Sequence, residues 1–156
     1  MTAEIVNTPS CLIPKEMYIE EMGLDYLNLL IPENQYESLG KDQLENYFLL
    51  YPKRNDGDSI HEITVMYNNI KDKFPDHSHA ACIHEYKDKC NLLVLNHETI
   101  FYSGQLQFSV KEDILYHLAH ILLHHFENVS QITVYYKHLS PAVLHLLSDY
   151  FEMKQL

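Results

Sequence analysis

The sequence predicts an α/β fold, because strand-like and helix-like segments alternate through its second half. Three short extended runs occupy residues 80–108 and are separated by turn residues. Apolar side chains recur at helical spacing on either side of them, in 60–74 and 110–126, and a further strand-like run and helix follow. The order helix, three strands, helix, strand, helix is typical of α/β proteins.

The first half of the chain carries weaker signals. Residues 4–14 predict a short strand and the aromatic run 45–51 (ENYFLLY) predicts another, with a stretch of mixed helical character between them. The polar segment 51–59 (YPKRNDGDS) has the composition of a loop. We therefore expect two parts, a partial N-terminal lobe over residues 1–59 and an α/β domain over residues 60–156.

The segment 60–74 predicts an amphipathic helix that ends before Pro75, because its apolar side chains lie three and four residues apart. Those side chains are Ile63, Met66, Tyr67, Ile70 and Phe74. Three extended runs come next and are joined by short turns, which predicts an antiparallel meander. The runs are 80–86, 91–96 and 99–108, and the turns are 87–89 and 97–98.

Two helices and one strand complete the expected domain. Ser109 is a candidate N-cap with Glu112 at the capping-box position, and together they predict a helix over residues 110–126. The run QITVYY follows as a strand. Ser140, a candidate cap before a first-turn proline, then predicts a last helix that ends at Phe151.

Composition excludes several classes of function. The 22 acidic residues outnumber the 11 lysines and arginines, so the formal charge is -11, and Arg54 is the single arginine. Such a chain repels phosphate backbones, so we expect no nucleic-acid binding. No apolar run approaches the ~18 residues of a membrane span. The three cysteines include no pair at two-residue spacing, which favours reduced thiols. The N-terminal residues MTAEIVNTPS contain no basic region followed by an apolar stretch, so we expect a cytoplasmic protein without a membrane span.

Glycine is scarce, and its scarcity excludes a glycine-rich phosphate loop. The chain has four glycines, Gly23, Gly40, Gly57 and Gly104, and no two of them lie within fifteen positions of each other. Loops that cradle phosphate need closely spaced glycines so that backbone amides can approach the anion. We therefore expect no cofactor.

Four polar side chains gather on one face of the helix predicted over 110–126. At about 100° per residue, Asp113, His117, His120 and His124 lie together, opposite the apolar face. Imidazoles three and four residues apart come within reach of one ion, and first-row metals favour such ligands. Two interpretations stay open: a metal site formed by His117, His120 and His124, or a polar face that meets solvent or another subunit.

Much of the second half also resembles a known fold family. The runs ACIHEY, CNLLVLNHE and TIFYSGQLQFS, followed by KEDILYHLAHILLHHF and QITVYYKHLSP, are similar to the second repeat of the actin-like, ribonuclease-H-like ATPase superfamily. More particularly, they resemble an uncharacterised bacterial family of degenerate actin-like proteins. The resemblance covers roughly half of the chain well. It implies a ribonuclease-H-like repeat over residues 60–156 and a partial actin-like lobe over residues 1–59.

The resemblance further implies two nucleotide-binding turns, and this sequence departs from both. Relatives that hydrolyse ATP carry an Asp-x-Gly phosphate turn between the first two strands and a glycine pair after the later strand. The corresponding segments here are 86–89 (YKDK) and 136–139 (YKHL), and neither contains glycine. Only the carboxylate of Asp88 remains to meet a metal. The resemblance therefore implies a pseudo-ATPase that has lost nucleotide binding.

Two function classes follow. The favoured one is a non-catalytic cytoplasmic scaffold or protein-interaction module on the degenerate actin-like fold. Complete relatives begin with a further meander and helix, so we expect the chain to leave a sheet edge that pairs with a protein partner or, in a homodimer, with a second copy. The alternative is a metal-binding protein or metal-dependent enzyme that uses the histidines of helix 110–126.

Overall fold

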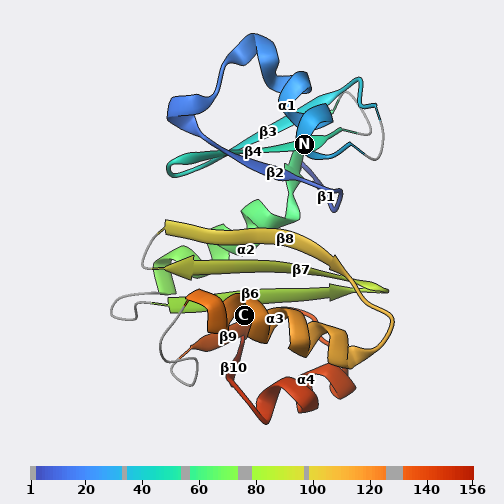
Figure 1. Ribbon diagram of the computed structural model, residues 1–156, viewed down its shortest axis with the longest axis vertical. Helices are drawn as coiled ribbons and strands as arrows, with labels where there is room; N and C mark the ends of the chain where they lie inside the picture. The colour runs from blue at the N-terminus through green and yellow to red at the C-terminus, as the bar shows by residue number, and fades with distance from the viewer. Residues whose placement is uncertain (1–2, 33–34, 54–56, 74–78, 97–98, 126–131) are drawn as a thin grey trace. The chain divides into compact units, whose positions relative to one another are not determined.

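The protein is a mixed α/β structure, as the sequence predicts. The computed structural model describes residues 3–32, 35–53, 57–73, 79–96, 99–125 and 132–156 (Figure 1). The chain divides into two compact units, residues 1–68 and residues 69–156. The sequence analysis placed the boundary earlier, between residues 59 and 60. None of the described helices is long and apolar enough to cross a membrane.

The first unit is built on a three-stranded antiparallel sheet in the order β2-β4-β3. Its strands are β2 (Cys11–Pro14), β4 (Tyr47–Pro52) and β3 (Leu39–Leu44). Two short 3-10 helices, η1 (Lys15–Met17) and η2 (Glu20–Met22), lead into α1 (Gly23–Leu30). Helix α1 packs on the sheet through a small apolar core of Ile13, Leu27, Ile31 and Leu50.

A second, two-stranded parallel sheet in this unit corrects two predictions. Strand β1 (Glu4–Val6) pairs with β5 (Ser59–His61). The single strand expected over residues 4–14 is therefore wrong, because Pro9 lies between β1 and β2 and has no amide proton for a ladder. The helix expected from residue 60 begins two residues later, as α2 (Glu62–Ile70), followed by η3 (Lys71–Lys73), because residues 59–61 are held in the pair with β1.

Strand β3 was missed altogether. Its sequence, LGKDQL, has apolar side chains only at its two ends: Leu44 is fully buried, and Leu39 is half-buried against the small core. β3 lies at one edge of its sheet, so one side of its backbone is unpaired within that sheet. Edge strands commonly carry charged and polar side chains, and the apolar period that reveals inner strands is then absent.

A half-buried carboxylate and its buried hydrogen-bond partners hold the start of α2. Asp42 Oδ2 on β3 accepts hydrogen bonds from His61 N and from Thr64 Oγ1, both at 2.7 Å. The hydroxyl of Tyr51 lies 2.9 Å from Asp42 Oδ1 and 2.9 Å from the Ser59 carbonyl oxygen. Burial raises the pKa of Tyr51 to about 12, so this hydroxyl keeps its proton and can donate at neutral pH. Carboxylate and hydroxyl thus fix where the helix begins.

His61 caps α2 with its own ring. Ring atom Nδ1 accepts from Ile63 N at 3.1 Å, and Nε2 lies 2.8 Å from the Thr8 carbonyl oxygen, which can only accept. The ring is therefore neutral, with its proton on Nε2. His61 is 1% exposed, and burial lowers its pKa.

We expect this histidine to make the first unit less stable in mild acid. A lowered pKa means that the unfolded chain takes up the proton first, so the stabilisation is complete above about pH 6.5 and declines as pH falls below that value toward the lowered pKa of the folded state. Urea unfolding at stepped pH should show a steeper loss for the natural protein than for His61→Asn, whose amide oxygen can still cap. Equal slopes would contradict the assignment.

The second unit holds a five-stranded sheet in the order β10-β9-β6-β7-β8. Its strands are β6 (His79–Tyr86), β7 (Lys89–Asn96), β8 (Thr99–Gln107), β9 (Thr133–Tyr136) and β10 (Glu152–Gln155). β6, β7 and β8 form the antiparallel meander that the sequence predicts, and β9 and β10 add to it in parallel. The expected turn at 97–98 and the expected boundaries at Phe74, Phe126 and Gln131 lie outside the described residues.

Helices α3 (Lys111–His125) and α4 (Pro141–Ser148) cover one face of this sheet (Figure 1). Alternate strand residues point into the layer between, where they meet one stripe of each helix. The buried members of this core are Ala81, Ile83, Cys90, Leu92, Val94, Ile114, Leu118, Leu122, Ile132, Val134, Val143, Leu147 and Phe151. The three cysteines form no disulfide, and Cys82 and Cys90 are buried in strands.

Three sequence predictions for the helices are corrected. The last helix ends at Ser148 rather than Phe151, and the polar run that follows is edge strand β10. Asp113, not Glu112, reaches back over the start of α3, where its Oδ2 accepts from Ser109 N at 2.9 Å and Val110 N at 3.2 Å. The Ser140 side chain makes no cap hydrogen bond, although Pro141 does occupy the first turn of α4.

Candidate functional site

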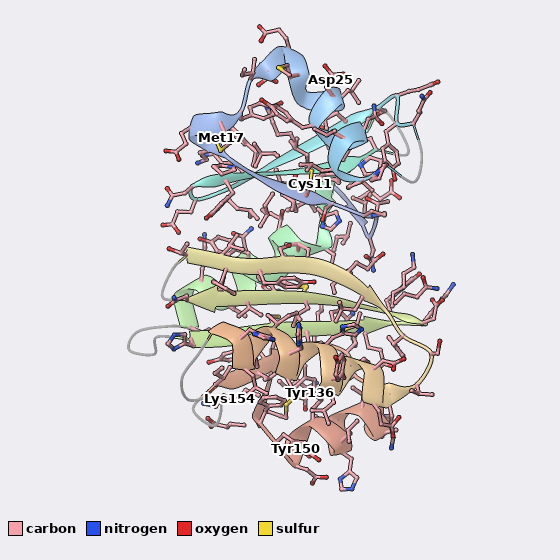
Figure 2. All side chains as sticks on the ribbon, in the orientation of Figure 1. Cys11, Met17, Asp25, Tyr136, Tyr150 and Lys154 are labelled. Carbon is pink, nitrogen blue, oxygen red and sulfur yellow. The ribbon has the colours of Figure 1, made fainter. Side chains whose placement is uncertain are left out.

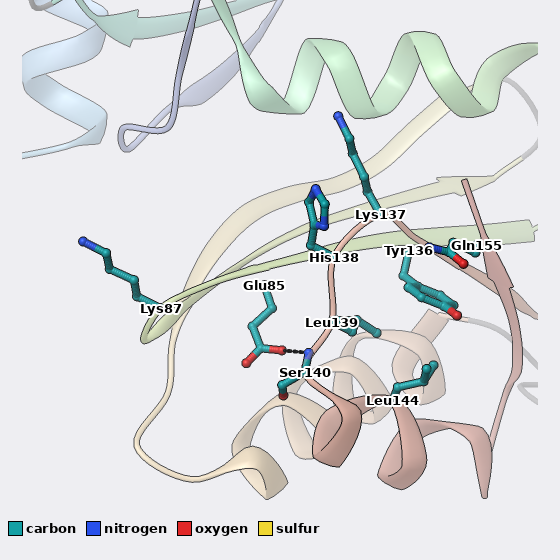
Figure 3. Close-up of a pocket in the computed structure, with 9 residues that line it drawn as sticks. All are labelled: Glu85, Lys87, Tyr136, Lys137, His138, Leu139, Ser140, Leu144 and Gln155. Carbon is teal, nitrogen blue, oxygen red and sulfur yellow. Dashed lines mark hydrogen bonds between the residues drawn. The ribbon is translucent and has the colours of Figure 1, made fainter.

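A pocket of about 590 Å³ lies at the carboxyl ends of parallel strands β6 and β9 (Figure 3). It is lined by Glu85, Lys87, residues 136–140, Leu144 and Gln155. In open α/β sheets, ligands commonly bind outside the carboxyl ends of the strands. The two glycine-free segments that the sequence analysis singled out, 86–89 and 136–139, therefore meet in a single pocket.

In the first of these segments, 86–89, one residue has a backbone conformation that glycine commonly adopts, although the residue is not glycine. Tyr86 pairs with Lys89 across the β6–β7 hairpin, so Lys87 and Asp88 form its two-residue turn. Lys87 has φ 57°, in the left-handed region that glycine adopts without strain. A lysine side chain thus stands at a backbone position that glycine would adopt without strain.

The second segment leads into α4, whose first free amide is already bound by a carboxylate. Glu85 Oε2 on β6 accepts a hydrogen bond from Ser140 N at 2.6 Å (Figure 3). Glu85 N in turn donates to the His138 carbonyl oxygen at 3.0 Å. Pro141 at the next position has no amide proton to offer. The carboxylate therefore occupies the end of α4 where the helix dipole favours an anion.

Positive side chains are present in this pocket but do not converge on Glu85. Lys87 and Lys137 both point away from Glu85, toward the rim (Figure 3). The ammonium group of Lys87 lies 5.6 Å from the ring centre of Tyr86. The rings of His84 and His138 lie 5.1 Å apart, centre to centre. The wall of the pocket thus carries the Glu85 carboxylate, and neither lysine side chain points toward it.

Three histidines of α3 make ring contacts, with one another or with a tyrosine. The rings of His120 and His124 meet edge to face, with their centres 4.4 Å apart. The ring of Tyr116 stacks on that of His120, with the ring centres 6.0 Å apart and an angle of 14° between the ring planes. The ring of His117 contacts Tyr116 at 5.7 Å. Among the described residues, no group of three or more His, Cys, Asp or Glu side chains is arranged to hold a metal ion.

The carboxylate of Asp113 accepts hydrogen bonds from backbone amides at the start of α3. Hydrogen bonds from Ser109 N and Val110 N lower its pKa, and His117 lowers it further. Asp113 was the fourth member of the polar stripe in the sequence analysis. The metal site at His117, His120 and His124 stays a prediction.

Sequence reasoning missed an apolar groove on the outer side of α3. The groove has a volume of about 550 Å³ and is lined by Glu112, Leu115, Tyr116, Ala119, Leu123, Tyr150 and Phe151. Tyr116, Leu123 and Tyr150 are 67%, 66% and 60% exposed. Tyr150 follows the end of α4 (Figure 2). Large apolar side chains gathered in one exposed groove are typical of an interaction surface.

Comparison with known structures identifies the fold of the chain. No family model and no curated protein matches the chain. A crystal structure from Bacteroides thetaiotaomicron, described as a protein with actin-like ATPase fold and unknown function, superposes with a TM-score of 0.81 over 96% of this chain, at 12% identity. The chain has an actin-like ATPase fold. It spans 65% of the length of that actin-like relative.

A second similar structure is a filament of AlfA bound to AMPPNP. It superposes with a TM-score of 0.46 and 12% identity, covering 98% of this chain and 51% of that chain. A match this low supports no comparison of individual parts. The actin-like fold confirms the family resemblance that the strand and helix runs carry, at the level of fold alone.

Proposed function

We propose that this protein is a non-catalytic protein-interaction module on an actin-like fold, and that it does not bind nucleotide. The observation that carries the proposal is the 2.6 Å hydrogen bond from Ser140 N to the Glu85 carboxylate. That contact lies in the pocket formed by the two segments where the family resemblance implies nucleotide-binding turns.

Electrostatics opposes a phosphate group in this pocket. A phosphate at the start of α4 would have to displace Glu85 or lie beside it. Two like charges about 4 Å apart cost about 4 kcal/mol at the effective dielectric of a protein surface. Lys87 and Lys137 do not offset this cost, because both side chains are exposed and point away from Glu85.

The groove on α3 supports the second part of the proposal. It offers exposed tyrosine and leucine side chains, and aromatic side chains are enriched where proteins bind one another. A cytoplasmic location also belongs to the proposal. It rests on three cysteines that form no disulfide, which a reducing compartment would keep as thiols.

Thermal unfolding with millimolar Mg·ATP tests the loss of nucleotide binding. We expect no change in Tm, because ligand at 100 times its Kd would add about 2.7 kcal/mol and shift the transition visibly. Glu85→Ala should lower the free energy of unfolding by about 1–2 kcal/mol, because Ser140 N loses its charged acceptor. Glu85→Gln keeps an acceptor and should cost less than half as much.

Each variant is then melted with and without Mg·ATP. A Tm increase in the natural protein would overturn the proposal. A Tm increase that is seen only in Glu85→Ala would support it, because that result identifies the Glu85 carboxylate as the group that excludes the anion.

A further inference from the structure

Helix α3 has two apolar faces, and only one of them lies in the core. Ile114, Leu118 and Leu122 are fully buried against the sheet. A second stripe, Glu112-Tyr116-Ala119-Leu123, lines the exposed groove with successive spacings of four, three and four residues. That spacing is typical of a helix seam that packs against another helix.

The spacing of the stripe is symmetric, so a second copy turned antiparallel can place the same positions in contact. The point midway between Tyr116 and Ala119 is also midway between Glu112 and Leu123. A two-fold axis at that point sets each Tyr116 against Ala119 of the second copy, a large side chain against a small one. The ring of Tyr116 lies nearly parallel to that of His120, with the ring centres 6.0 Å apart. This neighbour restricts the ring in part, which reduces the entropy lost on docking.

The polar side chains beside the stripe also suit an antiparallel arrangement. The stripe begins beside two acids, Glu112 and Asp113, whereas the other half of the helix carries His120 and His124. In an antiparallel pair about this axis, Glu112 lies opposite Leu123 of the second copy and Asp113 lies within a turn of His124 of the second copy. The two helix dipoles oppose each other favourably. Lys111 adds one positive charge at the acidic end of the helix, against the two carboxylates of Glu112 and Asp113.

We propose that the α3 groove is a homodimer interface, in which the stripes of two copies of this chain pack antiparallel about a two-fold axis. This inference rests on the proposed function as an interaction module and names the partner as a second copy. It assigns the histidine-bearing side of α3 to a subunit contact. Tyr150 and Phe151 flank the helix pair and extend the apolar contact.

Sedimentation equilibrium of the full chain at tens of micromolar tests the interface, and the natural protein is expected to be a dimer. Ala119→Arg places a charge in the small hole, and arginine is a good helix former, so α3 should still fold. An isologous contact contains every substitution twice. If the substitution in each copy raises the dissociation constant of the dimer about tenfold, the two together raise it about 100-fold. The matched control is Leu29→Arg on α1, an exposed leucine outside the stripe.

A swap of side chains tests the register. Tyr116→Ala leaves two small residues facing each other, and Ala119→Tyr opposes two tyrosines, so each single variant should weaken the dimer at least about tenfold. The double variant Tyr116→Ala/Ala119→Tyr restores a large-to-small pair on both sides of the axis. Recovery of most of the lost affinity is expected, and a merely local packing role for these residues would not produce it.

The remaining outcomes separate this inference from the proposed function. A monomer at 100 µM in the natural protein would overturn the α3 interface while leaving the result of the Mg·ATP melts unaffected. A dimer that survives Ala119→Arg would also overturn it, since association would then use another surface. An α3 dimer in a protein whose Tm rises with Mg·ATP would support the interface and overturn the loss of nucleotide binding.

Discussion

Replacing Asp42 with alanine is expected to lower the free energy of unfolding of the first unit by about 3 kcal/mol. Its Oδ2 is the acceptor for His61 N and Thr64 Oγ1, and both donor residues are buried, at 1% and 5% exposure. A buried donor left without a partner costs about 1–3 kcal/mol, and a charged acceptor is at the upper end of that range. The Tyr51 hydroxyl also loses its hydrogen bond to Asp42, but it can still donate to the Ser59 carbonyl oxygen, which lies 2.9 Å away.

A loss of that size is large for this unit. Domains have roughly 0.05–0.15 kcal/mol of stability per residue, so a unit that ends at Asn68 has about 3–10 kcal/mol in total. Because Asp42 joins β3 to the start of α2, the variant should expose the amides of both elements together. Hydrogen exchange followed by mass spectrometry would report this as faster exchange in β3 and α2.

Two variants serve as controls for Asp42. Asp42→Asn keeps one acceptor oxygen and should retain part of the stability. Asp25→Ala removes the same charge from an exposed position in the first turn of α1 (Figure 2), where the expected effect is within about 1 kcal/mol. Equal losses in Asp42→Ala and Asp25→Ala would show that charge, and not the buried hydrogen bonds, sets the effect.

The parts of the fold that the sequence predicts are those that bury an apolar face. Strands β6 and β7 carry long apolar runs, and α3 has Ile114, Leu118 and Leu122 at helical spacing, so their existence follows from hydrophobic pattern. Edge strands β3 and β10 cannot be predicted from hydrophobic pattern. Their side chains are mostly polar, and pairing with β4 and β9 through the backbone holds them in place.

The candidate site was predictable in part. The absence of glycine from 86–89 and 136–139 indicates which turns depart from the actin-like pattern, and the structure brings the two segments into one pocket. The contact between Glu85 and Ser140 could not be predicted, because it joins residues 55 positions apart. The α3 groove did leave a signal, namely the heptad-like spacing of Tyr116, Ala119 and Leu123 outside the core stripe.

The close approach of β3 and β4 predicts a large effect for Gly40→Ala. Gly40 on β3 is the cross-strand partner of Tyr51, and a Cβ at this position would lie 2.7 Å from Tyr51 Cδ2 and closer still to Cε2 and Cζ. The ring cannot turn away easily, because it is 1% exposed and its hydroxyl is held by Asp42 and Ser59. Overpacking of this kind costs about 1–3 kcal/mol, and we expect the upper end.

Gly57→Ala is the matched control, because a Cβ at Gly57 meets nothing within 4 Å. That change should leave stability unchanged or raise it by about 0.4–1 kcal/mol through the unfolded chain. Urea unfolding followed by circular dichroism compares the two alanine variants directly. The clash also predicts that Tyr51→Leu, which removes the ring, costs less in a Gly40→Ala background than in the natural protein. Additive losses in the double variant would contradict a direct contact between these positions.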